Sequence, residues 1–472
     1  MKKTILAFLF ALAAMFGMTV AQTPDFSMIG YATLNGGTTG GAAGQTVTPT
    51  TFEELKQYVE SELPYAILIT KEFTTGVSTF VDETGSIVDA TDAGARPTTF
   101  GAILKVKSNK TLLGVGSDAF FNRIGLVVQC QSNIIIRNIK FTMKDVPATR
   151  DGEYKILDTD GVTTVGDPDC IGIQADAESI PEAQRISQHI WVDHCEFYNE
   201  ADAYHKDRYD GLLDVKNDVR NMTVSWCVFH DHSKAMLSGK GNSDEYNRTV
   251  TYHHNWFHNI YGSRLPLLRY GQHHYYNNLM ENCDGDGLNL RIETNAYIEG
   301  CYFLNCKKPI FGKLSEGGQA LLVDNLFSGC GKLPAECTNL DGADFEYLKE
   351  SEEFNRACNF TPSELYSYTP DETTEVPDIV RQWAGVGKLP EETVDVIMPT
   401  KEETKIYNSG NVLTVESDAG AKLHLFTVNG QKVADYMVEG GRIDIRIDVA
   451  GCYIAMLEQD GKQLATTKIL VP

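Results

Sequence analysis

The sequence predicts an all-β protein, a right-handed parallel β-helix followed by a small C-terminal β-sandwich. Strand-like runs rich in β-branched and aromatic residues recur through the middle of the chain, with turn residues between them and no helical periodicity. Equivalent positions in the later runs are regularly spaced, because Asn255, Asn278, Cys301 and Asn325 are 23, 23 and 24 residues apart. A repeat of this length is typical of a solenoid in which each repeat forms one turn of the coil.

The first residues predict an export signal that is removed from the mature chain. Met1, Lys2 and Lys3 precede an apolar stretch, and Ala21 provides a small residue at the expected cleavage position. We therefore assign residues 1–21 to a signal peptide and expect a secreted or cell-surface protein. Residues 22–390 are assigned to the β-helix, and the helical spacing of residues 52–63 predicts a helix that caps its first turn.

Seven runs share one pattern, in which one position, here called the marked position, lies two residues before a large apolar residue. The runs are 134–141, 190–197, 222–229, 250–257, 274–280, 296–303 and 321–327. The marked positions are Ile139, Cys195, Cys227, Asn255, Asn278, Cys301 and Asn325. Because equivalent residues of stacked turns form columns, we expect the asparagines to bond backbone groups of neighbouring turns and the cysteines to fill the same buried position.

The chain contains 11 cysteines, an odd number, so not all of them can pair within the chain. Cys330, Cys337 and Cys358 lie outside the column and are the candidates for a disulfide. The absence of a Cys-x-x-Cys pair argues against a cysteine metal site. Insertions at residues 145–166 and 175–187 predict loops that project from the coil, where a binding cleft could be built.

A stretch rich in Pro, Thr and Glu predicts a linker at residues 391–404. Beyond it, residues 405–472 contain short strand-like runs with Asn-Gly and Asp-Gly turns between some of them, which indicates a β-sandwich. The expected strands are 412–416, 422–427, 442–448, 452–458 and 464–470.

The formal net charge of -23 at pH 7 excludes nucleic acid as a partner, because phosphate binding requires a basic surface. Hydrophobic residues make up 42% and charged residues 22%, an ordinary composition for a soluble protein. The negative charge also repels a polyanionic sugar at long range. Such a ligand would need a local basic cleft and a bridging cation.

Asp210 and Asp214 are candidate ligands for a divalent cation, although such a pair alone is more often a solvated part of a strand. An extended chain would separate them by about 13 Å, too far to share an ion about 2.4 Å from each oxygen. A shared ion therefore requires a bend, which Gly211 would permit. Asp169 opens the preceding turn of the coil and could reach the same place.

Three basic residues follow on the next turns of the coil. Lys234 ends one run, and Arg264 and Arg269 flank a proline in the next. Surface arginines are usually only solubilising, but this arrangement fits recognition of carboxylates. The histidine pair His253-His254 is not expected to bind a metal, because neighbours on a straight strand point to opposite faces.

Several ordered blocks resemble the signature blocks of the calcium-dependent pectate lyase family, which has a parallel β-helix fold. They are Asp169-Cys-Ile-Gly-Ile, Trp191-Val-Asp-His, Asp210-Gly-Leu-Leu-Asp, His230-Asp-His-Ser-Lys, Thr251-Tyr-His-His-Asn-Trp and Arg264-Leu-Pro-Leu-Leu-Arg-Tyr-Gly. Residues 105–116 and 134–138 are similar to the early strands of that family. The resemblance covers about residues 52–389.

The resemblance implies a role for each candidate residue. Asp169, Asp210 and Asp214 would bind Ca²⁺, Lys234 and Arg269 would bind substrate carboxylates, and Arg264 would be the catalytic base. The implied activity is cleavage of α-1,4-linked polygalacturonate by β-elimination, which gives unsaturated oligogalacturonates. The chain is expected to act as a monomer. Two alternatives remain open, a galacturonan hydrolase and a pectin-binding surface protein on the same fold.

The predicted sandwich resembles the C-terminal sorting domains of the Bacteroidetes type nine secretion system. The resemblance rests on Phe426-Thr-Val-Asn-Gly-Gln-Lys-Val and Gly451-Cys-Tyr-Ile-Ala. Cys452 replaces the usual aliphatic residue, and the usual Tyr-Pro-Asn-Pro opening is missing. The resemblance implies contact with outer-membrane secretion machinery.

Overall fold

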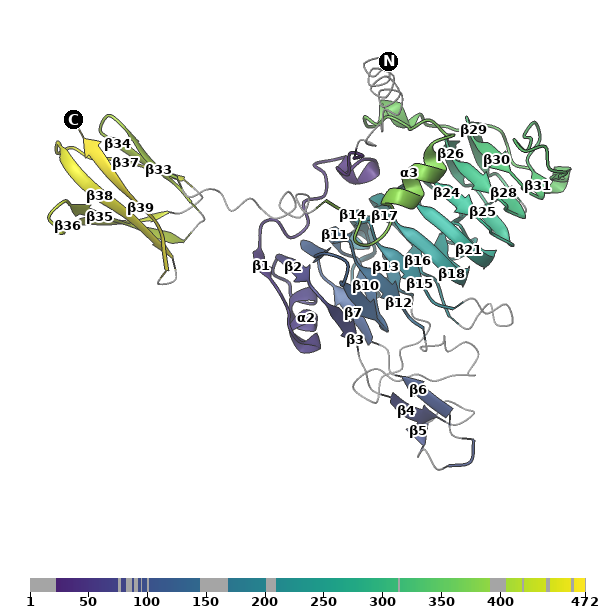
Figure 1. Ribbon diagram of the computed structural model, residues 1–472, viewed down its shortest axis with the longest axis horizontal. Helices are drawn as coiled ribbons and strands as arrows, with labels where there is room; N and C mark the ends of the chain where they lie inside the picture. Colours follow the sequence, from purple (N-terminus) through teal and green to yellow (C-terminus); the bar gives the residue numbers. More distant parts are fainter. Residues whose placement is uncertain are drawn as a thin grey trace, which may run out of the picture.

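The chain forms a long coil of parallel strands and, after it, a set of antiparallel strands (Figure 1). The computed structural model describes residues 23–74, 78–81, 87–88, 92–94, 96–99, 102–144, 169–200, 209–312, 315–390, 405–417, 420–438, 442–459 and 462–471. The predicted signal peptide, the loop at 145–166 and the linker at 391–404 lie outside these residues. No helix among the described residues is long and apolar enough to cross a membrane.

Three ladders of parallel strands make up the coil, which confirms the predicted parallel β-helix. Ladder A contains β1 (Gln45–Val47), β2 (Tyr65–Ile69), β8 (Lys110–Gly114), β11 (Ser132–Arg137), β14 (Ser187–Asp193), β17 (Val219–Ser225), β20 (Thr249–His253), β23 (Gln272–Tyr276), β26 (Asn295–Glu299) and β29 (Gln319–Val323). Ladder B contains β3 (Glu72–Thr74), β9 (Phe120–Asn122), β12 (Lys140–Thr142), β15 (Glu196–Tyr198), β18 (Val228–Lys234), β21 (Trp256–Ser263), β24 (Leu279–Glu281), β27 (Tyr302–Leu304) and β30 (Leu326–Ser328). Ladder C contains β7 (Ala102–Val106), β10 (Ile124–Gln129), β13 (Ile171–Gln174), β16 (Leu213–Lys216), β19 (Met236–Ser238), β22 (Leu267–Leu268), β25 (Asp286–Leu290) and β28 (Lys308–Phe311).

Each predicted run is in fact two strands, one in ladder A and one in ladder B. The residue between them has a φ of 46° to 58° in every turn, namely Asn138, His194, Trp226, His254, Asn277, Gly300 and Asp324. This left-handed backbone bends the chain sharply, so each strand-like run contains two strands that belong to different ladders. Most of these residues are not glycine, and the sequence therefore gives only a weak signal for the corner.

The predicted column of asparagines is confirmed. Asn278 Oδ1 accepts a hydrogen bond from the Asn255 backbone N at 2.9 Å, and Asn278 Nδ2 donates to the Tyr252 carbonyl at 2.9 Å. Asn325 Oδ1 likewise accepts from the Cys301 backbone N at 3.0 Å. The amides thus satisfy backbone groups at each corner that would otherwise be buried without a partner.

The interior of the coil is filled by stacked side chains. Phe141, Phe197, Phe229 and Phe257 form a continuous stack with ring-centre separations of 5.1, 4.9 and 4.8 Å. These are the large apolar residues of the predicted repeat, and they belong to the main hydrophobic core. Because every turn buries the same kind of side chain at the same place, the stacked turns hold neighbouring strands in register.

All 11 cysteines are free thiols, which contradicts the expectation of a disulfide among Cys330, Cys337 and Cys358. Cys330 is 1% exposed and lies inside the coil. Its Sγ contacts the Phe303 carbonyl at 3.4 Å, just as Cys306 Sγ contacts the Met280 carbonyl at 3.4 Å. Cys330 therefore belongs to a second column of small buried residues, one turn beyond Cys306.

Helix α2 (Phe52–Val59) covers the first turn of the coil, as predicted for residues 52–63. Its buried residues Leu55 and Val59 join the main core. A capping box at Thr51 and Glu54 satisfies the first backbone N–H groups of the helix. An unpredicted strand, β1, lies at the outer edge of ladder A beside β2.

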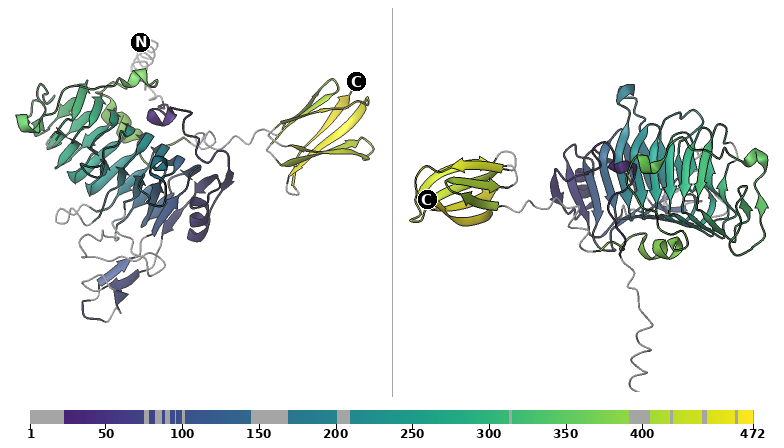
Figure 2. Two further views of the ribbon diagram at one scale, coloured as in Figure 1. Left: turned by 180° about the vertical axis from the view of Figure 1, so that it is seen from behind. Right: turned by 90° about the horizontal axis from the view of Figure 1, so that it is seen from above.

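Helix α3 (Val376–Trp383) packs on the outside of the coil against β24 (Figure 1). The remaining short elements are η1 (Tyr31–Thr33), β4 (Ser78–Val81), β5 (Ile87–Val88), β6 (Arg96–Thr99), η3 (Glu182–Gln184), β31 (Lys332–Leu333), β32 (Glu346–Tyr347), η4 (Glu350–Glu352) and η5 (Pro362–Glu364). Strands β4, β5 and β6 form a small antiparallel sheet of their own. Figure 2 shows the turns of the coil stacked side by side between α2 and β31.

The last part of the chain is a small β-sandwich, as predicted. One sheet contains β33 (Lys405–Ser409), β34 (Val412–Glu416) and β37 (Arg442–Arg446), and the other contains β35 (Ala421–Thr427), β36 (Lys432–Val438), β38 (Gly451–Gln459) and β39 (Lys462–Val471). The two sheets share a hydrophobic core of their own. Strands β33 and β36 were not predicted.

Candidate functional site

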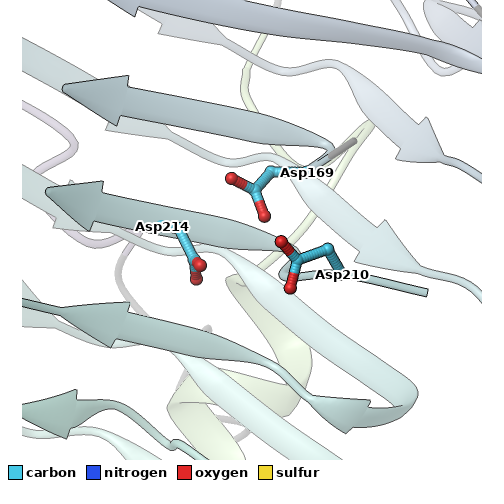
Figure 3. A group of neighbouring side chains, drawn as sticks. All are labelled: Asp169, Asp210 and Asp214. Atoms are coloured by element: carbon cyan, nitrogen blue, oxygen red, sulfur yellow. The ribbon is translucent and has the colours of Figure 1, made fainter. Parts of the chain in front are cut away.

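Three carboxylates meet where ladder C begins two successive turns. Asp169 precedes β13, Asp210 precedes β16, and Asp214 lies within β16. Their side chains point toward one another (Figure 3), and one oxygen of each lies within 4.8 Å of the others. No other group of three or more His, Cys, Asp or Glu side chains in the described part of the chain meets this criterion. The predicted convergence of Asp169 with the Asp210 and Asp214 pair is therefore what the structure contains.

The chain bends at Leu212, directly after Gly211, and Asp210 and Asp214 meet, so the bend that a shared ion requires is present one residue later than expected. The Gly211 backbone N donates to Asp169 Oδ1 at 2.9 Å. A Cβ atom added at Gly211 would collide with Asp214 Oδ1 and would lie 3.0 Å from Asp169 Oδ1. Glycine is needed here because there is no room for a side chain between the carboxylates.

Two of the three clustered carboxylates are buried, and Asp210 is partly exposed. Asp214 is 1% exposed and Asp169 is 8% exposed. Burial raises the pKa of Asp169 well above its usual value, and the neighbouring Asp214 adds to this rise. Burial also raises the pKa of Asp214, against the opposing effect of Lys216. The charge of Asp210 also raises the pKa of both Asp169 and Asp214, and an added cation would oppose these effects.

The donor set fits a calcium ion. All three side chains offer hard carboxylate oxygens, which are the ligands that Ca²⁺ prefers. Among the described residues, Asp214 Oδ2 is buried without a hydrogen-bond partner. Lys216 Nζ lies 3.4 Å from this oxygen, an ion-pair distance without a hydrogen bond, so the oxygen remains able to bind a cation.

Lys216 is a member of the site that the sequence reasoning missed. Its Nζ lies 2.8 Å from Asp169 Oδ2 and 3.4 Å from Asp214 Oδ2. Burial opposes its charge, but the Asp214 and Asp169 carboxylates more than compensate and raise the pKa of Lys216 above its usual value. Alternation along β16 was the available signal, because residues two apart on a strand share a face.

The three predicted cationic residues lie on the turns that follow. Lys234 ends β18 and its Nζ lies 3.4 Å from Asp210 Oδ1. Arg264 lies between β21 and β22, with a φ of 73°, and its carbonyl accepts from the Met236 backbone N at 2.8 Å. The charge of Arg264 acts on Asp214, which places its guanidinium within electrostatic reach of the cluster.

Arg269 follows β22, and its Nη1 donates to the Gly239 carbonyl at 2.7 Å. Burial lowers the pKa of Arg269, and the positive charges of Arg291 and Arg264 lower it further. Arg291 was not predicted. Leu268 pairs with Leu290, so Arg269 and Arg291 occupy equivalent places on neighbouring turns. Their separation by one repeat was the signal that could have identified Arg291.

The histidine pair behaves differently from the prediction. His253 Nδ1 lies 2.9 Å from His254 Nδ1, so the two rings do not point to opposite faces. The left-handed corner at His254, with a φ of 54°, is the reason. His254 Nε2 contacts Asp371 at 2.8 Å outside the coil, and the pair takes no part in the carboxylate cluster.

Comparison with known proteins gives consistent matches. The family model described as pectate lyase matches residues 3–389. A pectate trisaccharide-lyase of Bacillus licheniformis is 35% identical over 367 residues, which are 77% of this chain and 88% of the relative. Pectate lyase plyB of Emericella nidulans is 32% identical over 317 residues, which are 66% of this chain and 79% of the relative.

Solved structures share the fold of the coil. Pectate lyase Bsp165PelA from Bacillus sp. N165, in complex with trigalacturonate, matches with a TM-score of 0.52 and 26% identity, covering 77% of this chain and 100% of that one. Pectate lyase C from Erwinia chrysanthemi, determined with Ca²⁺, matches with a TM-score of 0.57 and 20% identity, covering 78% and 99%. The second likeness bears on the fold alone.

Proposed function

Because the chain belongs to the pectate lyase family, we propose that it is a polysaccharide lyase that cleaves polygalacturonate by calcium-assisted β-elimination. The observation that carries the proposal is the meeting of Asp169, Asp210 and Asp214 within reach of a row of cations. A negatively charged uronate can approach this acidic protein only where such local charges receive it.

The chemical difficulty lies in removing the C5 proton, because the neighbouring carboxylate is already negative. Calcium, when bound to Asp169, Asp210 and Asp214, would neutralise that carboxylate and stabilise the enolate-like charge that develops. Lys234 and Arg269 would bind uronate carboxylates and hold the sugar ring in place. The charged groups of Lys234 and Arg269 would take the place of water around the sugar, so that fixed positive charge faces the reacting carbon.

Arg264 would accept the C5 proton. The electron pair of the C5–H bond then forms the C4–C5 double bond, the C4–O bond breaks, and the leaving oxygen takes a proton from solvent. A guanidinium is a demanding base, because it is almost never deprotonated in water. Alkaline conditions favour the neutral guanidine that this step requires.

The first experiment follows ultraviolet absorbance while the purified protein is incubated with polygalacturonate, with Ca²⁺ or with a chelator. A lyase gives an unsaturated, absorbing product only when Ca²⁺ is present. A galacturonan hydrolase would cut the polymer without such a product, and a pectin-binding protein would leave it intact. Either of these results would contradict the proposal.

The role of Arg264 is tested by Arg264→Lys. We expect turnover to fall at least about 100-fold, the usual scale for loss of a general base, while binding of trigalacturonate changes little. Arg220→Lys is the control, because Arg220 is half exposed on β17 and pairs with Asp218. Normal turnover in Arg264→Lys would exclude this residue as the base.

The proposal extends to the location of the protein. Residues 1–21 would direct export, and the C-terminal sandwich would bind the secretion machinery of the outer membrane. Amino-terminal sequencing of the exported protein should then begin at Gln22, and deletion of residues 405–472 should leave the protein inside the producing cell. Export of the shortened chain at the normal level would exclude a sorting role for the sandwich.

A further inference from the structure

A buried ion pair lies next to Arg269 and takes no part in the mechanism above. Arg248 Nη1 lies 3.2 Å from Asp244 Oδ1, and both side chains are 0% exposed. The pair belongs to the loop between β19 and β20, on the way from ladder C to ladder A. A buried pair of charges is expensive to maintain and is a weak source of stability, so its position suggests another role.

Arg248 connects three successive turns of the coil. Its Nη1 donates to the Asn217 carbonyl at 2.9 Å, and its Nη2 donates to the Arg269 carbonyl at 2.7 Å and to the Asp244 carbonyl at 3.0 Å. Asn217 directly follows β16, the strand that carries Asp214. The guanidinium therefore ties the end of the calcium-binding strand to the backbone of the uronate-binding arginine.

Asp244 fixes Arg248 and the loop around it. Its Oδ2 accepts hydrogen bonds from the Lys240 backbone N at 2.7 Å and from the Asn217 backbone N at 3.2 Å. One carboxylate thus binds the guanidinium through Oδ1 and two backbone amides through Oδ2. Such a network is rigid because nearly every member holds two others.

The same loop also contacts the side chain of Arg269. Arg269 Nη1 donates to the Gly239 carbonyl, and the Arg269 backbone N donates to the Ser238 carbonyl at 2.8 Å. A Cβ added at Gly239 would lie 2.7 Å from Arg248 Nη2 and 2.8 Å from Arg269 Cβ. The loop, Arg248 and Arg269 are therefore packed together without spare room.

We propose that Arg248, held by Asp244, is a positioning residue for Arg269. It sets the distance between the guanidinium that receives a uronate carboxylate and the strand that carries Asp214. This inference rests on the proposed function, because it assigns Arg248 to the geometry of that site. Neither Arg248 nor Asp244 touches the substrate, since both are fully buried.

The test is a double-mutant cycle in the full-length protein, with Arg248→Gln, Arg269→Ala and the combination of both. Arg248→Gln should lower kcat/KM on polygalacturonate about 100-fold, the scale expected when a binding group is misplaced by about 1 Å. Once Arg269 is absent, the same change should lower kcat/KM by no more than about twofold. If the fold-losses of kcat/KM in Arg248→Gln and in Arg269→Ala multiply to give that of the double mutant, within a factor of about two, the proposal is overturned.

Conservative variants keep the test valid if Arg248→Gln does not fold. Arg248→Lys retains the charge but cannot reach all three carbonyl groups, and Asp244→Asn retains the shape but loses the charge. Both should show smaller losses of kcat/KM than Arg248→Gln. As with Arg248→Gln, these losses should disappear when Arg269→Ala is also present. Folding is checked by a cooperative thermal transition.

Arg137→Gln is the matched control, because Arg137 and Asp193 form another buried pair, at 2.6 Å, on ladder A. It should lower thermal stability but leave kcat/KM of the folded protein within about twofold of the wild type. A loss of kcat/KM equal to that of Arg248→Gln would mean a general structural effect and would overturn the proposal.

Failure of the proposed lyase function can be distinguished from failure of the positioning role of Arg248. In that case the wild-type protein gives no absorbing product, and the cycle is measured instead as the Kd for trigalacturonate by calorimetry. Coupling between Arg248 and Arg269 in that Kd still supports a positioning role, and independent effects still exclude it.

Discussion

Lys216 contacts two of the three clustered aspartates and therefore competes with any cation that binds there. We expect Lys216→Gln to tighten Ca²⁺ binding about tenfold, because charges about 4 Å apart near a surface interact by a few kcal/mol and part of this is screened. The affinity is measured by calorimetry. Lys240→Gln, which removes an exposed pair with Asp176 at 2.8 Å, is the control. Equal or weaker binding in Lys216→Gln would show that the ammonium does not compete.

His232 makes the stability of the site depend on pH. Its Nε2 contacts the Asp210 carbonyl at 2.8 Å, and burial lowers its pKa from 6.5 to about 4. The unfolded chain therefore takes up a proton before the folded one does. The contribution of the neutral His232 to the free energy of unfolding is complete above pH 6.5. It is lost as the pH falls toward 4, by about 3 kcal/mol in total.

The measurement is urea unfolding between pH 8 and pH 4 for the wild type and for His232→Gln, which keeps a donor for the Asp210 carbonyl. The variant should lose about 3 kcal/mol less on acidification, since the other buried histidines are common to both proteins. Parallel losses in the two proteins would rule out His232 as the titrating group.

At the residue scale, the sequence could identify the groups with a fixed motif but not those defined by a contact. Asp169, Asp210 and Asp214 followed from conspicuous blocks and from the need for a bend at Gly211. Lys216 escaped notice because a lysine beside acids on a strand is ordinary until the neighbouring turn supplies Asp169. Arg248 escaped for the same reason, because its partners lie on three different turns.

Among the elements, the bend before β16 is the one on which the carboxylate cluster depends. Gly211→Ala would place a methyl group against Asp214 Oδ1, so the carboxylates could not close around an ion. We expect Ca²⁺ affinity to fall at least about 100-fold while the coil remains folded, since the change lies at a single turn.

Calcium titration by calorimetry checks this result, and Trp fluorescence checks the fold. Gly241→Ala is the control, because an added Cβ there meets nothing within 4 Å. Normal Ca²⁺ affinity in Gly211→Ala would mean that the cluster can rearrange, and that the bend is not required.

The elements show where sequence reasoning succeeds and where it stops. The asparagine column and β34 were predicted because each repeats a local pattern or follows a clear turn. The corners at Trp226 and His254 were not, because a left-handed backbone at a residue other than glycine is imposed by packing in the folded coil. Helix α3 has only eight residues, and its packing on β24 decides its structure.

On the scale of the whole molecule, the coil and the sandwich each have a hydrophobic core, with no residue in common. The regular repeat explains why the coil could be predicted as a unit, since each turn repeats the same corner and the same buried column. The sandwich was predicted from turns and short strands alone, and its edge strands β33 and β36 lacked a comparable signal. A chain with two cores can unfold in two separate steps.

Calcium should therefore stabilise only one of the two units. All 4 tryptophans lie in the part of the chain before residue 390, so Trp fluorescence follows the coil and not the sandwich. At a Ca²⁺ concentration about 100 times the Kd, binding adds about 2.7 kcal/mol to the stability of the folded coil, which for a coil of this size raises its Tm by about 4 °C.

Thermal unfolding is followed by fluorescence for the coil and by calorimetry for both units, with Ca²⁺ or with a chelator. The fluorescence transition should shift and a separate transition of the sandwich should not. In Asp214→Asn the shift should disappear, because a neutral amide replaces one of the three charged ligands. An equal shift in both transitions, or a normal shift in Asp214→Asn, would place the calcium site elsewhere in the molecule.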